Sequence, residues 1–148
     1  MAEKRYHRMR AQDLEAFQHA KDDYWYRPVV FGKNLFTYVA YVPPGGFMPP
    51  HGHEEDPYEL SFYMLQGELE VMLDNDVFTV SPGDAVHIEP TVSLGVRNNG
   101  SSVASFLLTF TPPPPIASVA ALRERYAQRG GGIKPAAEIE ALLAHTRP

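Results

Sequence analysis

The chain contains no cysteine, and this absence excludes disulfide bonds, thiolate metal ligands and cysteine nucleophiles. It also lacks any apolar run of about 20 residues, the length that a membrane-spanning helix requires, so we expect no contact with a membrane. The basic residues near the N-terminus are not followed by an apolar stretch, so the sequence does not indicate a signal peptide. Together these absences favour a cytoplasmic protein.

An excess of positive charge is missing too, since the formal net charge is −5. Binding to the phosphates of a nucleic acid requires a basic surface, and we therefore expect no nucleic-acid partner. The 148 residues are 44% hydrophobic and 21% charged, a balance typical of a globular protein. The length predicts a single domain over residues 1–148.

Short runs rich in β-branched and aromatic residues fill the middle of the chain, with turn signals between them. They predict strands at residues 34–42, 58–65, 68–73, 77–81, 85–89, 94–98 and 103–110. Asp74-Asn75-Asp76 predicts a hairpin turn between two of them. Strands at this spacing, without a helical pattern between them, indicate a mainly β barrel or sandwich over about residues 25–111.

Helical patterns flank this β region. Residues 10–23 contain good helix formers with Leu14 and Phe17 on one side, which predicts a short N-terminal helix. Pro112–Pro115 cannot continue a β ladder. Beyond them, residues 116–129 and 135–145 predict two C-terminal helices, separated by three glycines, within an extension over 116–148.

His51 and His53 are the most informative residues for function. In a strand, residues i and i+2 face the same side at a separation of about 7 Å. Two imidazoles placed in this way can converge on one metal ion.

The residues around this pair resemble the first motif of the cupin superfamily, G(X)5HXH(X)3–4E(X)6G. Gly45 is followed by five residues and then by His51-Gly52-His53, and Glu59 and Gly67 resemble the close of the motif. The second motif, G(X)5PXG(X)2H(X)3N, is echoed by Pro82–Ile88 and by Asn98 or Asn99. The resemblance covers residues 35–110 and implies a cupin-type jelly-roll barrel (a double-stranded β-helix), with the helices outside it.

The spacing around Glu59 departs from the first motif. Five residues separate His53 from Glu59, and seven separate Glu59 from Gly67, so the family's glutamate position falls on Leu60. A slip of one residue turns a strand side chain to the opposite face. Either a β-bulge absorbs the extra residue and Glu59 joins the histidines, or Glu59 faces solvent and Leu60 points inward.

The second motif also lacks its histidine. The corresponding position falls on Leu94 or Gly95, and neither side chain binds metal. His87 does not obviously replace it, because Val86 and Ile88 are the expected inward positions and His87 should then face away.

The resemblance implies one divalent transition metal held by His51, His53 and Glu59. Two histidines and a carboxylate are typical of non-haem iron sites, and Mn, Ni, Cu or Zn are alternatives. The implied function is a metal-dependent enzyme that acts on a small organic molecule, with dioxygenase-type oxidation as the first hypothesis. A lyase or isomerase, a non-catalytic cupin that binds a small ligand, and a structural accessory protein stay open. Cupins commonly form dimers, which predicts a homodimer.

Aromatic side chains are expected to line the barrel. Tyr38 or Tyr41 could offer a hydroxyl to the substrate, and Arg97 could hold an anionic group. The residues predicted to point inward are Phe36, Tyr38, Phe47, Met48, Phe62, Met64 and Phe106.

Overall fold

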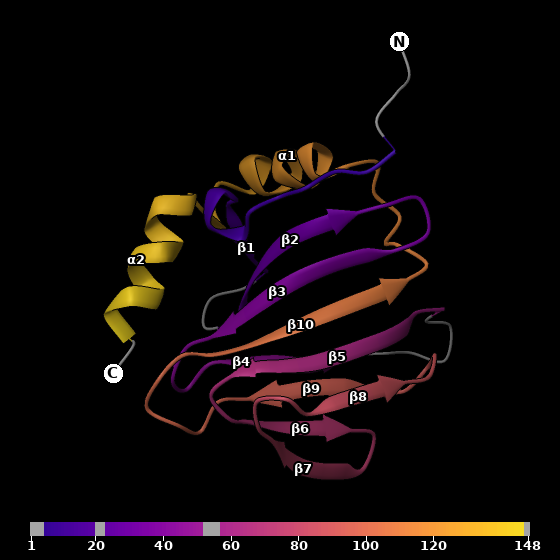
Figure 1. The fold of residues 1–148 in the computed structure, drawn as a ribbon, viewed down its shortest axis with the longest axis vertical. Helices are drawn as coiled ribbons and strands as arrows, with labels where there is room; N and C mark the ends of the chain where they lie inside the picture. Colours follow the sequence, from indigo (N-terminus) through magenta and orange to yellow (C-terminus); the bar gives the residue numbers. More distant parts are fainter. Residues whose placement is uncertain (1–4, 20–22, 52–56, 147–148) are drawn as a thin grey trace.

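The computed structural model describes residues 5–19, 23–51 and 57–146. Its strands are β1 (Ala16–Gln18), β2 (Trp25–Phe31), β3 (Phe36–Val42), β4 (Phe47–His51), β5 (Glu59–Gln66), β6 (Leu69–Leu73), β7 (Asp76–Val80), β8 (Ala85–Ile88), β9 (Leu94–Arg97), β10 (Ala104–Thr111) and β11 (Ile133–Lys134). They form a seven-stranded sheet, ordered β11-β1-β2-β3-β10-β5-β8, and a four-stranded sheet, ordered β4-β9-β6-β7 (Figure 1). The named strands pair antiparallel, as the predicted mainly β architecture requires.

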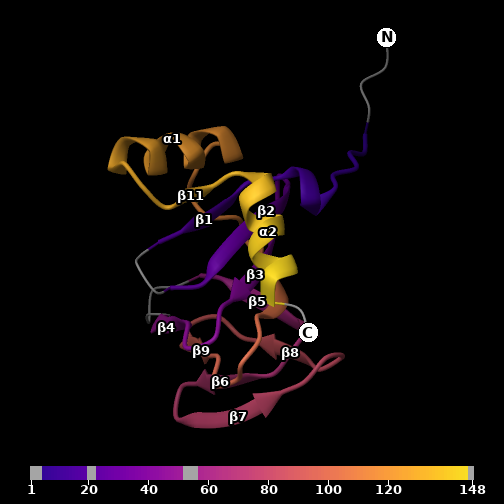
Figure 2. The same cartoon turned by 90° about the vertical axis from the view of Figure 1, so that its left-hand side faces the viewer.

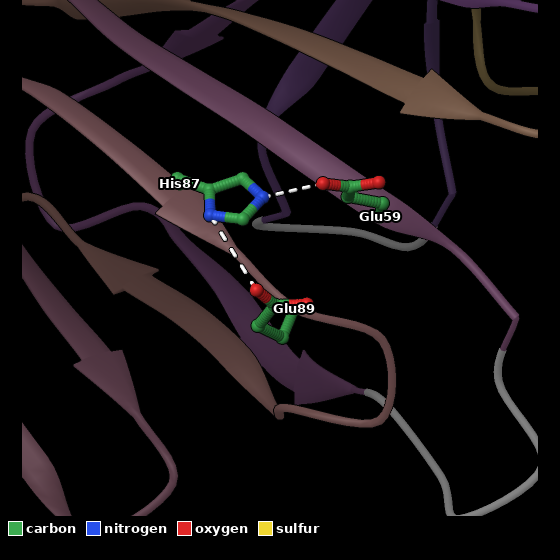
Figure 3. Close-up of side chains that lie close together, drawn as sticks. All are labelled: Glu59, His87 and Glu89. Atoms are coloured by element: carbon green, nitrogen blue, oxygen red, sulfur yellow. Dashed lines mark hydrogen bonds and ion pairs between the residues drawn. The ribbon is translucent and has the colours of Figure 1, made fainter.

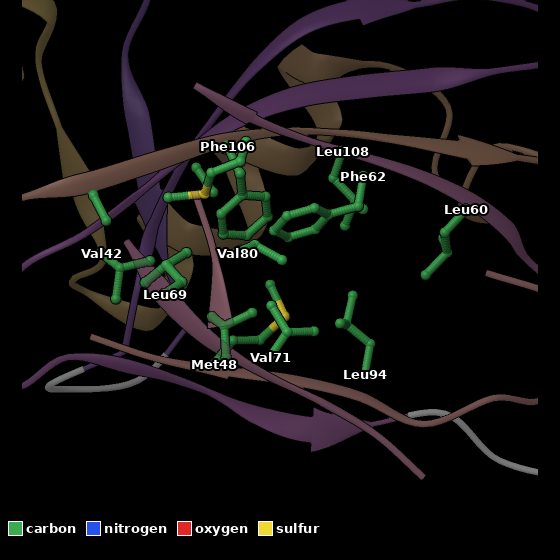
Figure 4. Close-up of a cluster of buried hydrophobic side chains, with 14 of the residues drawn as sticks. Val42, Met48, Leu60, Phe62, Leu69, Val71, Val80, Leu94, Phe106 and Leu108 are labelled. Atoms are coloured by element: carbon green, nitrogen blue, oxygen red, sulfur yellow. The ribbon is translucent and has the colours of Figure 1, made fainter. Parts of the chain in front are cut away.

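The core lies between the two sheets. Burial alternates along β5, where Phe62 and Met64 are fully buried while Ser61 and Tyr63 are exposed. Phe62 stacks on Phe106 of β10 with ring centroids 4.5 Å apart, at the centre of a cluster drawn from both sheets (Figure 4). Each sheet therefore has one face in the core, which explains the period of two in the sequence.

The predicted interior positions are largely confirmed. Six of the seven are buried: Phe36, Tyr38, Met48, Phe62, Met64 and Phe106. The prediction for Phe47 is wrong, since its side chain is 36% exposed. Met48 takes the inward position at this point of β4, and strand alternation turns the preceding residue outward.

The helix predicted over residues 10–23 is also wrong for the described part of that segment. A 3-10 helix, η1 (Ala11–Asp13), is followed directly by strand β1. Ala16 and Phe17 are fully buried in β1, which pairs with β2 on one side and β11 on the other. Tertiary contacts of a strand have overridden the helical propensity of these residues.

Both C-terminal helices are confirmed, as α1 (Val119–Arg129) and α2 (Ala136–Thr146). Ser118 caps α1 by accepting a hydrogen bond from the backbone N–H of Ala121 at 3.1 Å. Gly130 ends the helix with φ of 79°, a left-handed conformation that glycine adopts without steric cost. Within the described ranges, no helix combines the length and the hydropathy that crossing a bilayer requires.

Helix α2 packs on the outside of the barrel. Ile139, on its apolar side, is fully buried in a cluster with Ala16, Tyr41 and Val103. Figure 2 shows α2 in front of the large sheet, with α1 above it. The large sheet therefore has its inner face in the core and part of its outer face beneath α2.

A buried asparagine fixes the turn that leads into β4. Asn98 is 1% exposed, and its side-chain Nδ2 donates a hydrogen bond to the carbonyl oxygen of Val42 at 2.8 Å. Its backbone carbonyl oxygen accepts a hydrogen bond from the N–H of Gly45, and its backbone N–H donates one to the carbonyl oxygen of Gly46, at 3.0 Å in each case. The turn that precedes β4, and with it the strand that carries His51, is held in place by this residue.

Candidate functional site

A cavity of about 450 Å³ opens beside the core, on the inner side of the large sheet. Much of its wall is formed by Tyr24, which directly precedes β2, Tyr26 on β2, Tyr38 on β3 and Tyr126 on α1. We call it the tyrosine pocket. The segment 114–116, which leads from β10 towards α1, lines it as well.

The tyrosine hydroxyls form two hydrogen-bonded pairs in this wall. Tyr38 donates to the hydroxyl oxygen of Tyr24 at 3.3 Å, and the hydroxyl oxygens of Tyr26 and Tyr126 are 2.8 Å apart. The rings of Tyr26 and Tyr38 lie side by side, with centroids 5.0 Å apart. The pocket therefore presents aromatic surfaces with hydroxyl groups between them.

These phenols are neutral at physiological pH. Burial raises the pKa of Tyr24 to about 12. It also raises the pKa of Tyr26, Tyr38 and Tyr126 above the ordinary value of a phenol. One hydroxyl of each pair can therefore donate a hydrogen bond to a ligand, since its partner's proton is engaged within the pair, and none of the four phenols is ionised to act as a base.

Few charged groups line the tyrosine pocket. Asp23 is 3% exposed, whereas His19 and Arg125 are exposed. A bound molecule would meet mainly apolar walls and hydroxyl groups, together with the acidic side chain of Asp23 and the permanently cationic side chain of Arg125.

The structure describes only part of the predicted metal set. His51 is the last residue of β4, and its backbone lies opposite Leu94 of β9. The side chain of His51 and the whole of His53 lie outside the described residues. Pro49, on the same strand as His51, lines the tyrosine pocket. Metal binding by His51 and His53 stays a prediction.

Glu59 lies on the outer face of β5, while Leu60 takes the buried position. Its carboxylate is 2.5 Å from Nε2 of His87 on β8, and Nδ1 of His87 is 3.8 Å from Glu89 (Figure 3). This is the solvent-facing alternative for Glu59, and His87 faces outward as predicted. One metal set containing Glu59, His51 and His53 stays a prediction, because neither histidine side chain is described.

Glu59, His87 and Glu89 could themselves hold a metal ion, since one ligand atom from each lies within 4.8 Å of the others. In the observed arrangement, the imidazole offers a different nitrogen to each carboxylate, as a protonated ring does. The hydrogen bond to Glu59 raises the pKa of His87 above its ordinary value. A metal would have to displace a ring proton, because a nitrogen that donates a proton cannot also coordinate.

Comparison with known proteins now identifies the family. A family model described as a cupin domain matches residues 38–110, from β3 to the end of β10. This chain is a small cupin-domain protein. The match confirms the resemblance seen in the sequence, and no match was found among curated proteins.

Solved structures show the same jelly-roll fold. An RmlC-like cupin from Shewanella frigidimarina has a TM-score of 0.65 and 18% identity, over 74% of this chain and 94% of that one. KdgF from Halomonas sp. has a TM-score of 0.59 and 22% identity, over 67% and 87%. A predicted oxalate decarboxylase from Thermotoga maritima has a TM-score of 0.62 and 16% identity, over 70% and 96%. At these identities, the likeness establishes the fold of this cupin alone.

Two further residues were predicted to contact a substrate. Tyr38 lines the tyrosine pocket, so it is placed where such a contact is possible. Arg97 is exposed on β9, opposite Phe47 of β4 and Glu70 of β6, and is not among the described residues that line the pocket. A catalytic role for either residue stays a prediction.

Sequence reasoning missed most of the pocket wall. Tyr24, Tyr26 and Tyr126 carry no local signal that they meet, and Tyr26 and Tyr126 are 100 residues apart in the chain. It also missed the pairing of His87 with Glu59. That contact could have been predicted by pairing the strand at residues 59–66 with the strand at 85–88. Side chains on the outer face of both strands then lie next to one another.

Proposed function

We propose that this cupin is a metal-dependent enzyme that acts on a small organic molecule held in the tyrosine pocket, by an oxidation of the dioxygenase type. The observation that carries the proposal is the pocket. Its volume of about 450 Å³ falls within the range of about 300–1,000 Å³ that is usual for small-molecule sites. Apolar walls with a few convergent polar groups are typical of such sites as well.

The lining indicates the kind of molecule. The rings of Tyr26 and Tyr38 offer flat apolar surfaces on which another planar group can pack. Neutral hydroxyl groups donate hydrogen bonds to oxygen atoms of a ligand. The substrate class supported by this wall is a planar or aromatic molecule that carries hydroxyl, carbonyl or carboxylate oxygens.

The metal is supported by the HxH motif in the sequence and by the place of its first residue, His51, at the end of strand β4. Histidine nitrogens suit Fe, Mn, Ni, Cu or Zn, whereas the Glu59 carboxylate is engaged with His87 on the outer face. A bound divalent ion would supply Lewis acidity and a position for O₂ or substrate. The chain's own residues bind and orient the substrate: the tyrosine hydroxyls hold its oxygens, and the aromatic walls exclude water.

Metal analysis tests the catalytic half of the proposal. Purified protein is reconstituted separately with Fe, Mn, Ni, Cu and Zn, and bound metal is measured for wild type, His51→Ala, His53→Ala and His87→Ala. We expect wild type and His87→Ala to bind one of these metals equally, and both other variants to lose it. Equal retention in His51→Ala and His53→Ala would refute metal binding by this pair.

A ligand screen tests the binding half. Thermal shift against planar oxygen-containing acids and phenols should yield stabilising compounds, and a ligand at 100 times its Kd raises stability by about 2.7 kcal/mol. Tyr38→Phe removes one pocket hydroxyl, whereas Tyr63→Phe changes an exposed tyrosine on the outer face. Weaker binding in Tyr38→Phe alone is expected, and identical affinities in the two variants would place the ligand elsewhere.

The outward position of Glu59 favours a second candidate, a non-catalytic cupin that binds the same class of molecule as an effector. Without a carboxylate, two histidines hold a metal less firmly. Ligand binding that is unchanged in metal-free protein and in His51→Ala would support this candidate over the enzyme.

A further inference from the structure

Arg27 is buried on the opposite side of the large sheet from the tyrosine pocket. Its side chain is 1% exposed, and strand alternation sends it to the outer face because its neighbour Tyr26 faces inward. Nη1 donates to Oε1 of Glu140 on α2 at 2.8 Å and to the hydroxyl oxygen of Tyr41 at 3.3 Å. One end of the guanidinium is therefore held by α2 and by β3.

The other edge of this guanidinium lacks acceptors. Nε and Nη2 of Arg27 are buried, and no described residue accepts a hydrogen bond from either of them. In a guanidinium, the N–H groups of Nε and Nη2 point the same way, spaced to meet the two oxygens of a carboxylate. Leaving buried hydrogen-bond donors of a charged group unpaired costs free energy. A bound acceptor that pairs with both donors on this edge would therefore be stabilised.

A cavity of about 380 Å³ adjoins this side chain, between the sheet and α2. We call it the Arg27 cavity. Its polar lining includes Gln12, Gln66 and Ser105, and its apolar lining includes Val39, Leu65 and Leu143. Gln12 and Gln66 are exposed, long side chains. Nε and Nη2 are closed to solvent, so a small molecule in this cavity reaches them only after side chains around Arg27 move.

We propose that the Arg27 cavity binds a small organic acid, whose carboxylate accepts hydrogen bonds from Nε and Nη2 and whose short apolar tail lies on the aliphatic lining. Glu140 balances the formal charge of Arg27, so affinity depends on two short-range hydrogen bonds in a dry environment and not on long-range attraction. This site is separate from the tyrosine pocket, and it does not require the function proposed above. Since α2 supplies Glu140 and Leu143, the acid would tie this helix to the sheet.

Nitrogen-15 NMR of the arginine Nε–H groups directly reports on the Nε and Nη2 edge of Arg27. The Arg27 signal is assigned as the one missing from Arg27→Lys, with Arg8→Lys as the matched exposed variant. Wild type is titrated with sodium butyrate, with neutral butyramide and with sodium chloride. We expect a saturating shift of the Arg27 signal with butyrate alone. No shift of the Arg27 signal, or an equal shift with butyramide, would overturn the proposal. Proton exchange between the Arg27 Nε–H and a bound water that butyrate does not displace would overturn it as well.

Variants separate this site from general salt effects. Arg27→Lys keeps the positive charge but loses the two-donor edge, so butyrate affinity should fall by about tenfold or more. Glu140→Gln removes the carboxylate that balances the charge of Arg27, so the affinity of this variant for the butyrate anion should rise. Equal affinity in wild type and Arg27→Lys would refute the site. If Arg27→Lys does not fold, the wild-type titration and Glu140→Gln decide the question, and unchanged affinity in Glu140→Gln then counts against it.

Discussion

Replacing Asn98 tests whether one buried amide holds the turn that positions β4. Its Nδ2 donates to the carbonyl oxygens of Val42 at 2.8 Å and Ser102 at 2.9 Å, and its Oδ1 accepts from the backbone N–H of Gly100 at 2.8 Å. Asn98→Ala removes all three hydrogen bonds. The carbonyl of Val42, a fully buried residue, then loses its side-chain donor.

The cost follows from these contacts. Each lost hydrogen bond destabilises by about 1 kcal/mol, and a buried group left unsatisfied adds about 1–3 kcal/mol. We therefore expect Asn98→Ala to lower the free energy of unfolding by about 4–6 kcal/mol. For a chain of this size, each kcal/mol corresponds to roughly 2–4 °C in Tm.

Urea denaturation followed by circular dichroism measures this loss, with Asn99→Ala as the matched control. Asn99 is exposed, and its amide lies 3.5 Å from the Glu70 carboxylate, so its replacement should change stability by less than about 0.5 kcal/mol. Asn98→Ala should also lower metal or ligand affinity if β4 carries the site. A stability difference below about 1 kcal/mol between the two variants would refute the assigned role of Asn98.

Three further predictions concern the outer face, the core and the pocket. The pKa of His87 is raised in the folded state by its bond to Glu59, so this contact stabilises fully below the unfolded pKa near 6.5 and is lost as pH rises through the folded value. An NMR titration should therefore give a higher pKa for His87 in wild type than in Glu59→Gln, and equal values would contradict the contact. Phe62→Ala should cost about 3–5 kcal/mol in denaturant unfolding because it empties the stack on Phe106, whereas Leu65→Ala, at an exposed position, should cost far less. Absorbance titration should show that Tyr24→Phe removes a phenol that ionises near pH 12, and loss of one that ionises near pH 10 would argue against its burial.

Local patterns predicted most of the barrel, because strands alternate between core and solvent. The period of two along residues 59–66 matches the observed burial of Phe62 and Met64. The hairpin at Asp74 and the helix ends at Ser118 and Gly130 are set by short-range geometry, which neighbouring residues decide. Each of these features is settled within a few residues of the chain.

The N-terminal segment shows where local reasoning fails. Its residues favour a helix, yet Phe17 stacks on Tyr126 of α1 with centroids 5.0 Å apart, and β1 fills a place between β2 and β11. Burial of such side chains outweighs differences in helix propensity, which are a fraction of a kcal/mol per residue. The residues near position 17 in the sequence do not indicate its contact with Tyr126 or the pairing of β1 with β2 and β11.

Sequence alone determined the family, the mainly β fold and the inward position of Tyr38, because motif spacing and strand alternation are properties of the chain read in order. Only the tertiary structure decided that Glu59 pairs with His87, that Tyr24, Tyr26 and Tyr126 gather around Tyr38, and that Arg27 lies beneath α2. Those contacts join segments far apart in sequence, and strand order, register and helix docking bring them together through the burial of one shared core.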